Sequence, residues 1–254
     1  MLPNFARHIF YKLHHTERGP GRWLANAMSY GFMGYVRLTG RKPKMDMTPL
    51  LIISHKYKFI YIGIPKTATR SMRDAFHGDN ASRYGTEIYE TRPAFFKALE
   101  DYPDYYKFSF VRNPYARVLS CYNSKIGHKD LSLLKRARIL SFYKGLEAGM
   151  RFEDFAKWLN TEEGQDQCAD RHWMSQNRFL YMDGQSICDF IGKYENLEQD
   201  LETLAGKIGI TPPTLSKGGW ISGASNYHDI YDDQTRDLIA KRYARDIELF
   251  NYKF

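Results

Sequence analysis

The sequence predicts an α/β fold, with a single domain built on a central parallel sheet that is flanked by helices. Short apolar runs rich in β-branched and aromatic residues alternate along the chain with longer segments of helical periodicity, a pattern typical of such sheets. The 254 residues are 43% hydrophobic and 15% aromatic, so a sizeable core can form. No linker rich in Gly, Ser, Pro or charge divides the chain, and one domain is therefore expected.

The first strand is expected at 58–64, where an apolar run ends at Pro65. A run this short and nearly unbroken indicates a strand that is buried on both faces. The loop Pro65–Ser71 then leads into a helix expected at 71–76.

The same order of strand, turn and helix recurs twice. A strand at 107–111 precedes a turn at 112–114 and a helix that begins over 115–122. A strand at 189–194 precedes a helix at 196–208, in which apolar residues recur at helical spacing: Leu197, Leu201, Leu204 and Ile208. Two further helices are expected, one around 152–159 and a closing one over 234–250.

The N-terminal segment carries most of the net charge. Of the formal charge of +8, residues 1–45 hold +7, from eight Lys or Arg and one acid, whereas the remaining 209 residues hold 29 bases and 28 acids. We therefore expect a basic helical arm at 1–50, followed by the folded domain at 51–254. Such an arm suits an anionic membrane surface, an acidic glycan or a nucleic acid, but it could equally be a solvated basic face.

The cysteines Cys121, Cys168 and Cys188 are widely spaced and fit neither a disulfide framework nor a zinc site. Reduced thiols in a cytoplasmic protein are the simplest interpretation. The N-terminus carries charges where the apolar core of a signal peptide would stand. The most apolar stretch, 23–38, falls short of the roughly 20 apolar residues that a membrane span needs. We expect a soluble cytoplasmic protein whose arm could rest on the inner face of the membrane.

The loop Pro65-Lys-Thr-Ala-Thr-Arg-Ser71 has the composition of a P-loop-like anion-binding site. It leaves the carboxyl end of a buried strand and opens a helix, which is where ligands bind in open α/β sheets. Unpaired N–H groups and the helix dipole favour an anion there, and Lys66 adds a positive charge. Because no glycine directly precedes Lys66, the loop is not a Walker A motif, which disfavours a kinase or an ATPase. Taken alone, the loop could also be a helix cap beside a surface lysine.

A second anion site is predicted at the end of the next strand. Arg112 follows that strand, and Ser120 lies eight residues later, about two turns into the helix. A guanidinium and a hydroxyl can donate together to one phosphate. Two such sites at neighbouring strand ends suit a ligand with separate phosphate-like groups, such as 3′-phosphoadenosine 5′-phosphosulfate (PAPS).

These residues resemble the sulfotransferase family. The PKTxTxS loop after a strand, with FxFVRNPYxRxxSxY downstream, is similar to the two PAPS-binding motifs of sulfotransferases. The likeness is greatest to the Golgi carbohydrate sulfotransferases and their bacterial relatives. It continues through His172-Trp173 and Gln176, 189–200 and 243–252, so it covers roughly 55–254.

The resemblance implies roles for individual residues. The loop residues Lys66, Thr67, Ala68, Thr69, Arg70 and Ser71 would bind the 5′-phosphosulfate, and Lys66 would neutralise the charge that develops on the departing phosphate oxygen. Arg112 and Ser120 would bind the 3′-phosphate, and Ser225 would belong to a loop that closes over the co-substrate. In-line sulfuryl transfer depends mainly on positioning and charge stabilisation, so no metal is expected.

The general base departs from the family pattern. Related enzymes generally carry a histidine or glutamate base ahead of the 3′-phosphate motif, but 78–111 contains no histidine. Glu87 and Glu90 fall where relatives place the base, and either could instead be a solvated surface acid. We favour Glu90, because it precedes the expected start of a helix at 91–93 and should face the cleft. His172 is a further candidate.

The expected function is sulfuryl transfer from PAPS to a hydroxyl of a glycan or glycolipid, with no nucleic acid as partner. A sulfotransferase for a small alcohol or phenol is one alternative. A non-catalytic relative that binds a membrane or polyanion through its arm is another. Lys66, Arg112 and Ser120 argue against a non-catalytic protein, whereas the missing histidine argues mildly for one.

Overall fold

The computed structural model describes residues 49–90, 92–127, 143–215 and 227–254. The chain divides into two compact units, of which the larger comprises 46–129 and 149–254. Of the smaller unit, only 143–148 lie within the described residues. The basic arm expected at 1–50 lies outside the described residues except for its last two positions, and Leu50 is the first residue of a strand.

A mixed five-stranded sheet forms the centre of the larger unit, in the order β3-β1-β2-β4-β7. Its strands are β1 (Leu50–Ser54), β2 (Phe59–Gly63), β3 (Thr86–Tyr89), β4 (Tyr106–Val111) and β7 (Phe190–Lys193). β2, β4 and β7 are parallel, whereas β1 is antiparallel to both β2 and β3. The predicted α/β class is confirmed, and the three expected strands are the parallel ones. The sheet is mixed because β1 and β3, which were not predicted, add an antiparallel half.

The helices that connect and flank these strands are α3 (Thr69–Phe76), α4 (Ala81–Tyr84), α5 (Arg92–Asp101), α6 (Pro114–Lys125), α8 (Phe152–Leu159), α9 (Asn177–Leu180), α10 (Leu197–Ile208), α11 (Asp233–Arg242) and α12 (Ala244–Leu249). Single 3₁₀ turns occur at Gly78–Asn80, Glu162–Gly164, Tyr194–Asn196 and Tyr227–Ile230, and a small hairpin pairs Tyr181–Met182 with Gln185–Ser186. The single closing helix expected over 234–250 is instead two helices, α11 and α12, which meet at Tyr243.

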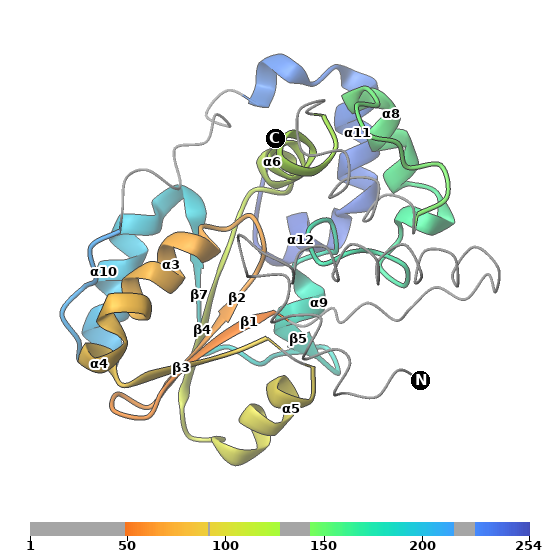
Figure 1. Ribbon diagram of the computed structural model, residues 1–254. Coiled ribbons are helices and arrows are strands. Elements are labelled where there is room, and N and C mark those ends of the chain that lie inside the picture. The colour runs from red at the N-terminus through yellow and green to blue at the C-terminus, as the bar shows by residue number, and fades with distance from the viewer. Residues whose placement is uncertain (1–48, 91, 128–142, 216–226) are drawn as a thin grey trace, which may run out of the picture. The chain divides into compact units, whose positions relative to one another are not determined.

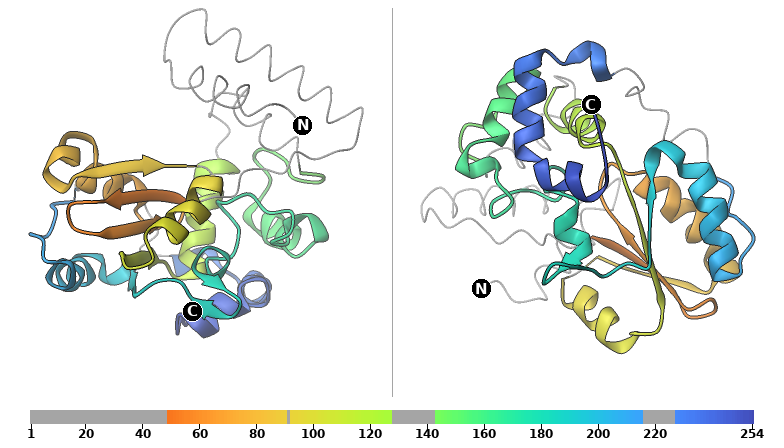
Figure 2. Two further views of the ribbon diagram at one scale, coloured as in Figure 1. Left: turned by 90° about the horizontal axis from the view of Figure 1, so that it is seen from below. Right: turned by 180° about the vertical axis from the view of Figure 1, so that it is seen from behind.

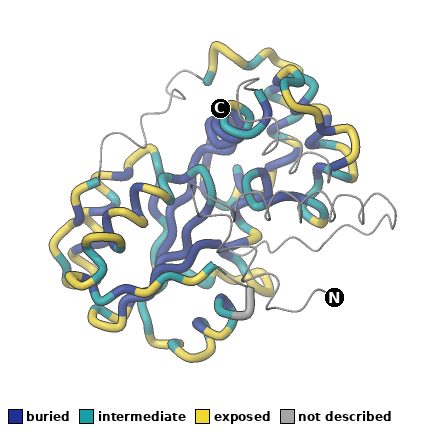
Figure 3. Tube along the Cα trace, viewed as in Figure 1, coloured by how far each residue is buried: buried dark blue, intermediate teal, exposed yellow. Residues whose placement is uncertain are grey.

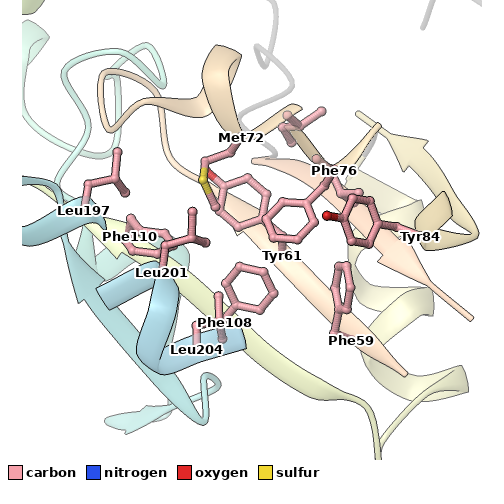
Figure 4. Close-up of a cluster of buried hydrophobic side chains, with 12 residues drawn as sticks. Phe59, Tyr61, Met72, Phe76, Tyr84, Phe108, Phe110, Leu197, Leu201 and Leu204 are labelled. Carbon is pink, nitrogen blue, oxygen red and sulfur yellow. The ribbon is translucent and has the colours of Figure 1, made fainter. Parts of the chain in front are cut away.

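The hydrophobic core lies between one face of the sheet and the helices α3 and α10. Alternate residues of a strand share a face, and on this face β2 and β4 contribute four aromatic rings: Phe59, Tyr61, Phe108 and Phe110. Met72 and Phe76 of α3 and the leucines of α10 pack against these rings (Figure 4). Every residue of β1 and β2 is buried, as the nearly unbroken apolar run of β2 predicted (Figure 3).

Helices α5, α9 and α12 lie on the other side of the sheet from α3 and α10 (Figure 1 and Figure 2). Helix α6 begins just after β4, and its first eight residues, Pro114–Cys121, are all buried. The two predicted anion-binding segments emerge from the carboxyl ends of β2 and β4, and the second leads directly into α6.

Candidate active site

The two predicted anion-binding segments meet at one edge of the sheet. Because β2 and β4 are adjacent and parallel, with Ile62 opposite Ser109, their carboxyl ends lie side by side. One segment is the loop between β2 and α3, and the other begins at Arg112. A direct contact joins them, since Nη1 of Arg112 donates to the backbone oxygen of Lys66 at 3.3 Å.

The loop after β2 has an unusual backbone. Lys66 and Ala68 both adopt positive φ, 75° and 62°, a left-handed conformation that non-glycine residues seldom take. Thr67 and Thr69 stabilise the turn, because both hydroxyls donate to the backbone oxygen of Ile64. Helix α3 makes its first internal hydrogen bond from the Met72 N–H to the Ala68 oxygen. The N–H groups at the start of the helix therefore have no partner within it, which is the usual basis of anion binding at a helix N-terminus.

Replacing Ala68 with glycine is expected to stabilise the protein by about 0.5–1 kcal/mol. Glycine relieves a left-handed strain of roughly 1–2 kcal/mol, and the greater freedom of glycine in the unfolded chain offsets part of that gain. The midpoint of denaturant unfolding measures the change. Ala75→Gly, within α3, is the control and should lower the midpoint, because Ala75 is helical and buried. A lower midpoint for Ala68→Gly would contradict the strained conformation.

Lys66 lies among other cations. Its Nζ donates to Oγ of Ser124 at 3.0 Å. Burial lowers the pKa of Lys66, and the nearby charges of Lys125, Arg112 and Arg70 lower it further. A bound anion would relieve this repulsion, so the electrostatics around Lys66 favour a negatively charged ligand.

Arg112 is buried, with 4% of its surface exposed, and its guanidinium lies 4.2 Å from the ring centroid of Tyr194. Its backbone is fixed by Gln176, whose side chain accepts from the Arg112 N–H and donates to the Arg112 carbonyl, both at 2.9 Å. Ser120 lies on α6 and is also buried. The strand end, its arginine and the start of α6 are thus held in place before any ligand binds.

Among the described residues, the predicted anion-binding segments hold two buried donors without a hydrogen-bond partner, Nε of Arg112 and Oγ of Ser71, and the hydroxyl of Tyr61 in β2 is a further one. An unsatisfied buried polar group costs about 1–3 kcal/mol, so proteins rarely leave one without a reason. One donor belongs to each of the predicted anion-binding segments. The donor set therefore fits a ligand that carries two acceptor-rich groups, as PAPS does.

Arg117 connects the two segments to a third one, and its importance was not predicted. Its side chain is 1% exposed and donates to three backbone carbonyls, those of Pro65 at 3.1 Å, Met174 at 2.8 Å and Arg171 at 3.3 Å. The loop after β2 and the segment around His172 therefore depend on one guanidinium. The motif spacing placed Arg117 inside the family pattern, but contacts of this kind carry no periodic signal.

A buried carboxylate supports Gln176. Asp246 of α12 accepts from the backbone N–H groups of Gln176 and Asn177, at 2.7 and 2.9 Å, and from the Asn177 side chain at 2.6 Å. Gln176 in turn hydrogen-bonds to the backbone of Arg112. The motif residues near 176 and 246 therefore stabilise the carboxyl end of β4. The sequence resemblance included both segments but did not indicate this connection.

A pocket of about 420 Å³ opens at the same edge of the sheet, and its volume lies within the usual range for ligand sites. Its lining includes Lys66, Thr69 and Arg70 of the loop together with Glu90 and His172. The remaining charged groups in the lining are Arg73, Lys125 and Arg171. Two of the three predicted base candidates are therefore brought to Lys66, and the third, Glu87, is not among the lining residues.

The pairing of β3 explains why the two glutamates separate. β3 runs antiparallel to β1, with Glu87 opposite Ile53 and Tyr89 opposite Leu51. Glu90 therefore follows β3 near Leu50, which pairs with Gly63 at the carboxyl end of β2. Glu87 lies toward the other end of β1, where it is exposed, accepts a hydrogen bond from the Tyr89 hydroxyl and lies 4.0 Å from His55.

His172 contacts a buried carboxylate. Asp170, 4% exposed, accepts from Nδ1 of His172 at 2.5 Å and from its backbone N–H at 2.9 Å. Burial alone would raise the pKa of Asp170, but the hydrogen bonds and charge of His172 outweigh burial and lower it. Burial lowers the pKa of His172, and Asp170 offsets this only in part.

Ser225, the predicted closing-loop residue, lies outside the described residues. Within the described ranges, no group of three or more His, Cys, Asp or Glu could hold a metal ion. In the same ranges, no helix is both long and apolar enough to cross a membrane. The cysteines Cys121, Cys168 and Cys188 are free.

The protein has an α/β fold in which the two segments predicted to bind anions are linked at neighbouring strand ends. A model of the Sulfotransferase family matches residues 49–253, and the chain therefore belongs to the sulfotransferase family. This confirms the resemblance that the motifs predicted.

Curated relatives include carbohydrate sulfotransferases. The chain is 26% identical to Carbohydrate sulfotransferase 14 of Danio rerio over 63% of this chain and 48% of that protein. It is 25% identical to Carbohydrate sulfotransferase 14 of Mus musculus, over 80% of this chain and 60% of that protein. It is 24% identical to Carbohydrate sulfotransferase 11 of Rattus norvegicus, over 80% of this chain and 66% of that protein. The chain thus spans about half to two thirds of the length of these relatives. No solved structure was found to match it.

The predicted cytoplasmic location is contradicted by these matches and is wrong. The relatives are carbohydrate sulfotransferases, the group whose motifs linked this chain to Golgi enzymes. The free cysteines do not decide the compartment, because a reduced thiol on its own is compatible with either location. A contact of the N-terminal arm with a membrane surface finds no support in the matches.

Proposed function

We propose that this protein transfers a sulfuryl group from PAPS to a hydroxyl of a carbohydrate. The observation that carries the proposal is the pair of unsatisfied buried donors, Arg112 Nε and Ser71 Oγ, on two linked segments at adjacent strand ends. PAPS carries a phosphosulfate and a separate phosphate on one nucleotide, so one ligand can satisfy both segments.

In this proposal the loop after β2 binds the phosphosulfate. The N–H groups at the start of α3, together with the side chains of Lys66 and Ser71, donate to its oxygens. PAPS supplies the sulfuryl group, which moves to the acceptor oxygen while the bond to the 5′-phosphate breaks. Lys66 neutralises the charge that develops on the departing phosphate oxygen, and the fixed loop dipoles require no reorganisation.

Arg112 and Ser120 would bind the 3′-phosphate. The guanidinium is buried and its position is fixed by Tyr194 and by the Gln176 contact to its backbone. A preorganised guanidinium loses little entropy on binding, so it can discriminate strongly between nucleotides with and without a 3′-phosphate. Ser225 remains a predicted contact from the loop outside the described residues.

The similarity to Carbohydrate sulfotransferases 14 and 11 supports a carbohydrate acceptor. The pocket that Glu90 and His172 line next to Lys66 has room for a sugar unit. A glycolipid headgroup presents the same hydroxyl chemistry as a free glycan. A small alcohol or phenol as acceptor is the alternative that an assay must separate from a carbohydrate.

The first test is nucleotide selectivity. 3′-Phosphoadenosine 5′-phosphate (PAP) is expected to raise the thermal unfolding temperature far more than AMP, because only PAP can occupy the Arg112 site. At about 100 times its dissociation constant, PAP should add about 2.7 kcal/mol to the free energy of unfolding. In the Arg112→Met variant the advantage of PAP over AMP should disappear. Equal shifts with PAP and AMP in the unaltered protein would exclude the assignment of the second segment.

The second test is transfer itself. Labelled PAPS is incubated with desulfated chondroitin, heparosan, a neutral N-acetyllactosamine oligosaccharide and a simple phenol, and the products are analysed by mass spectrometry. Sulfation of at least one carbohydrate and not of the phenol supports the proposal. Transfer to the phenol alone would show that the acceptor is a small phenol and not a carbohydrate. PAP binding without transfer to any acceptor would indicate a nucleotide-binding protein without sulfotransferase activity.

A further inference from the structure

His172 lines the pocket that contains Lys66 and is hydrogen-bonded to the buried Asp170, a pairing that the motif pattern did not indicate. We propose that His172 removes the proton from the acceptor hydroxyl and that Asp170 is the positioning residue that holds the imidazole in the form able to do so. This inference rests on the sulfotransfer proposed above. It assigns the base that the sequence left open among Glu87, Glu90 and His172.

Asp170 fixes the tautomer of the His172 ring. An ionised carboxylate can only accept hydrogen bonds, and the pKa of Asp170 is lowered by its contacts with His172. Because Nδ1 of His172 lies 2.5 Å from Oδ1 of Asp170, Nδ1 must carry the proton. In the neutral ring Nε2 then holds the free lone pair. Among the described residues Nε2 has no hydrogen-bond partner, and the ring lines the pocket.

Several hydrogen bonds hold the backbone around His172 in place. The backbone oxygen of Asp170 accepts from the N–H groups of Trp173 and Met174, at 3.1 and 2.9 Å, which closes a tight turn around His172. Arg117 donates to the carbonyls of Arg171 and Met174, which precede His172 and follow Trp173. The imidazole is therefore fixed relative to the loop after β2, because Arg117 also donates to Pro65. A fixed base close to the reacting centre is what proton transfer requires.

Burial and the neighbouring charges favour the neutral form of His172. The charged groups that line the pocket with His172 are Lys66, Arg70, Arg73, Glu90, Lys125 and Arg171, and Asp170 contacts the ring directly. Burial lowers the pKa of His172; Asp170 opposes this, and Lys125 and Arg171 add to it. The ring is therefore neutral near neutral pH, as a base must be. A histidine starts from an ordinary pKa of about 6.5 and a glutamate from about 4.3, so the histidine needs less adjustment to serve as a base near pH 7.

The proposed step moves one proton to His172 and one sulfuryl group to the acceptor. The acceptor O–H bond breaks and its proton moves to Nε2 of His172. The acceptor oxygen forms a bond to sulfur, and the bond from sulfur to the 5′-phosphate oxygen breaks. That oxygen leaves with the electron pair on PAP, next to Lys66. Asp170 stays ionised throughout and stabilises the imidazolium that forms.

The activity test compares His172→Gln, Asp170→Asn and Glu90→Gln on the glycan that the unaltered protein sulfates. His172→Gln should lower kcat by about 10²–10⁴-fold, the usual contribution of a general base. PAP should still raise the unfolding temperature of all three variants, which shows that each is folded and binds nucleotide. Near-normal turnover in His172→Gln, or a loss of turnover confined to Glu90→Gln, would overturn the assignment.

The pH profile separates a positioning role of Asp170 from a merely structural one. Activity should rise with pH as His172 loses its proton. Removing the Asp170 charge makes the imidazolium less stable and lowers the pKa of His172, so Asp170→Asn should move the rising limb to lower pH and reduce its plateau. Glu90→Gln should leave the limb in place. The proposal is contradicted if the rising part of the pH–activity profile stays at the same pH in Asp170→Asn, or if it disappears in Glu90→Gln.

A measurement without acceptor tests the same pair. Nitrogen-15 NMR of the histidine-labelled protein reports which ring nitrogen carries the proton, and His172→Gln identifies its signals. The Nδ1–H tautomer is expected in the unaltered protein, with a larger share of the other tautomer in Asp170→Asn. A predominant Nε2–H tautomer would exclude His172 as the base even if sulfotransfer is confirmed. Failure of PAP to bind or of any transfer would instead refute the proposed function.

Discussion

Lys66→Met is expected to reduce kcat for sulfotransfer by about 10²–10³-fold, the size of effect seen when one charge-stabilising donor is removed from an active site. The reason is the position of the side chain. It projects from a left-handed loop residue toward Ser124 and lines the pocket together with His172. Methionine has similar length and meets the same backbone strain, so the substitution removes the charge and leaves the loop conformation in place.

The stability of Lys66→Met should not fall. Because burial and neighbouring cations lower the pKa of Lys66 in the folded protein, its charged form is less favourable there than in the unfolded chain. The destabilisation caused by the charged lysine is fully present below the pKa of Lys66 in the folded protein, and it is relieved as pH rises toward the pKa of lysine in the unfolded chain. At neutral pH, substitution with methionine removes this destabilisation. Unchanged or higher thermal stability together with a large loss of kcat would separate catalysis from folding.

Lys97→Met is the matched control. Lys97 is exposed on α5, pairs with Asp101 and lies outside the pocket lining, so kcat should stay within about twofold of the unaltered protein. The informative comparison is kcat at saturating PAPS. If Lys66→Met retains normal kcat and only weakens nucleotide binding, Lys66 binds the ground state and does not stabilise the departing group.

The parallel half of the sheet could be predicted because its sequence signals are local. The strands β2 and β4 are short apolar runs, and each is followed at once by polar residues and a helix. Adjacent parallel strands bring their carboxyl ends together, so the proximity of Lys66 and Arg112 followed from topology alone. The predicted boundaries differ from the observed ones by only a few residues, as for α3, which begins at Thr69 instead of Ser71.

The antiparallel half could not be predicted in the same way. β1 is an apolar run that directly follows the basic segment, and it pairs with β2 through a short turn. β3 has four residues and lies at the sheet edge, and only one of its residues is buried. Its sequence therefore lacks a clear alternation of apolar and polar residues that would indicate a strand. The separation of Glu87 from Glu90 depends on the register of this edge strand. The sequence therefore could not show that only Glu90 of the two glutamates lines the pocket.

The support of the site was also beyond sequence reasoning. Asp170 and His172 are two residues apart in an irregular turn, where no periodicity indicates which side chains meet. The contacts of Arg117 reach carbonyls 52, 57 and 54 residues away. Such contacts depend on the packed tertiary structure. Every residue has a backbone carbonyl, so the residue types of the partners do not indicate which carbonyls Arg117 contacts.

Arg117→Met is expected to destabilise the protein by roughly 3–5 kcal/mol, the largest effect on stability that we expect of a single substitution. The buried guanidinium satisfies three backbone carbonyls, and a buried acceptor left without a partner costs about 1–3 kcal/mol. The charge of Arg117 also acts favourably on the buried Asp246. Methionine fills much of the space but supplies no donor. For a domain of this size the unfolding temperature should fall by roughly 6–20 °C.

Denaturant unfolding followed by circular dichroism measures the change, with two variants for comparison. Arg117→Lys keeps the charge but has a single ammonium in place of a planar fork, so it should lie between the unaltered protein and Arg117→Met. Arg245→Met removes an exposed arginine whose one ion-pair partner among the described residues is Glu248, and its effect should stay within about 0.5 kcal/mol. If Arg117→Met unfolds at the same denaturant concentration as Arg245→Met, water or other donors replace the guanidinium. The link between the loop after β2 and the His172 segment would then not depend on Arg117.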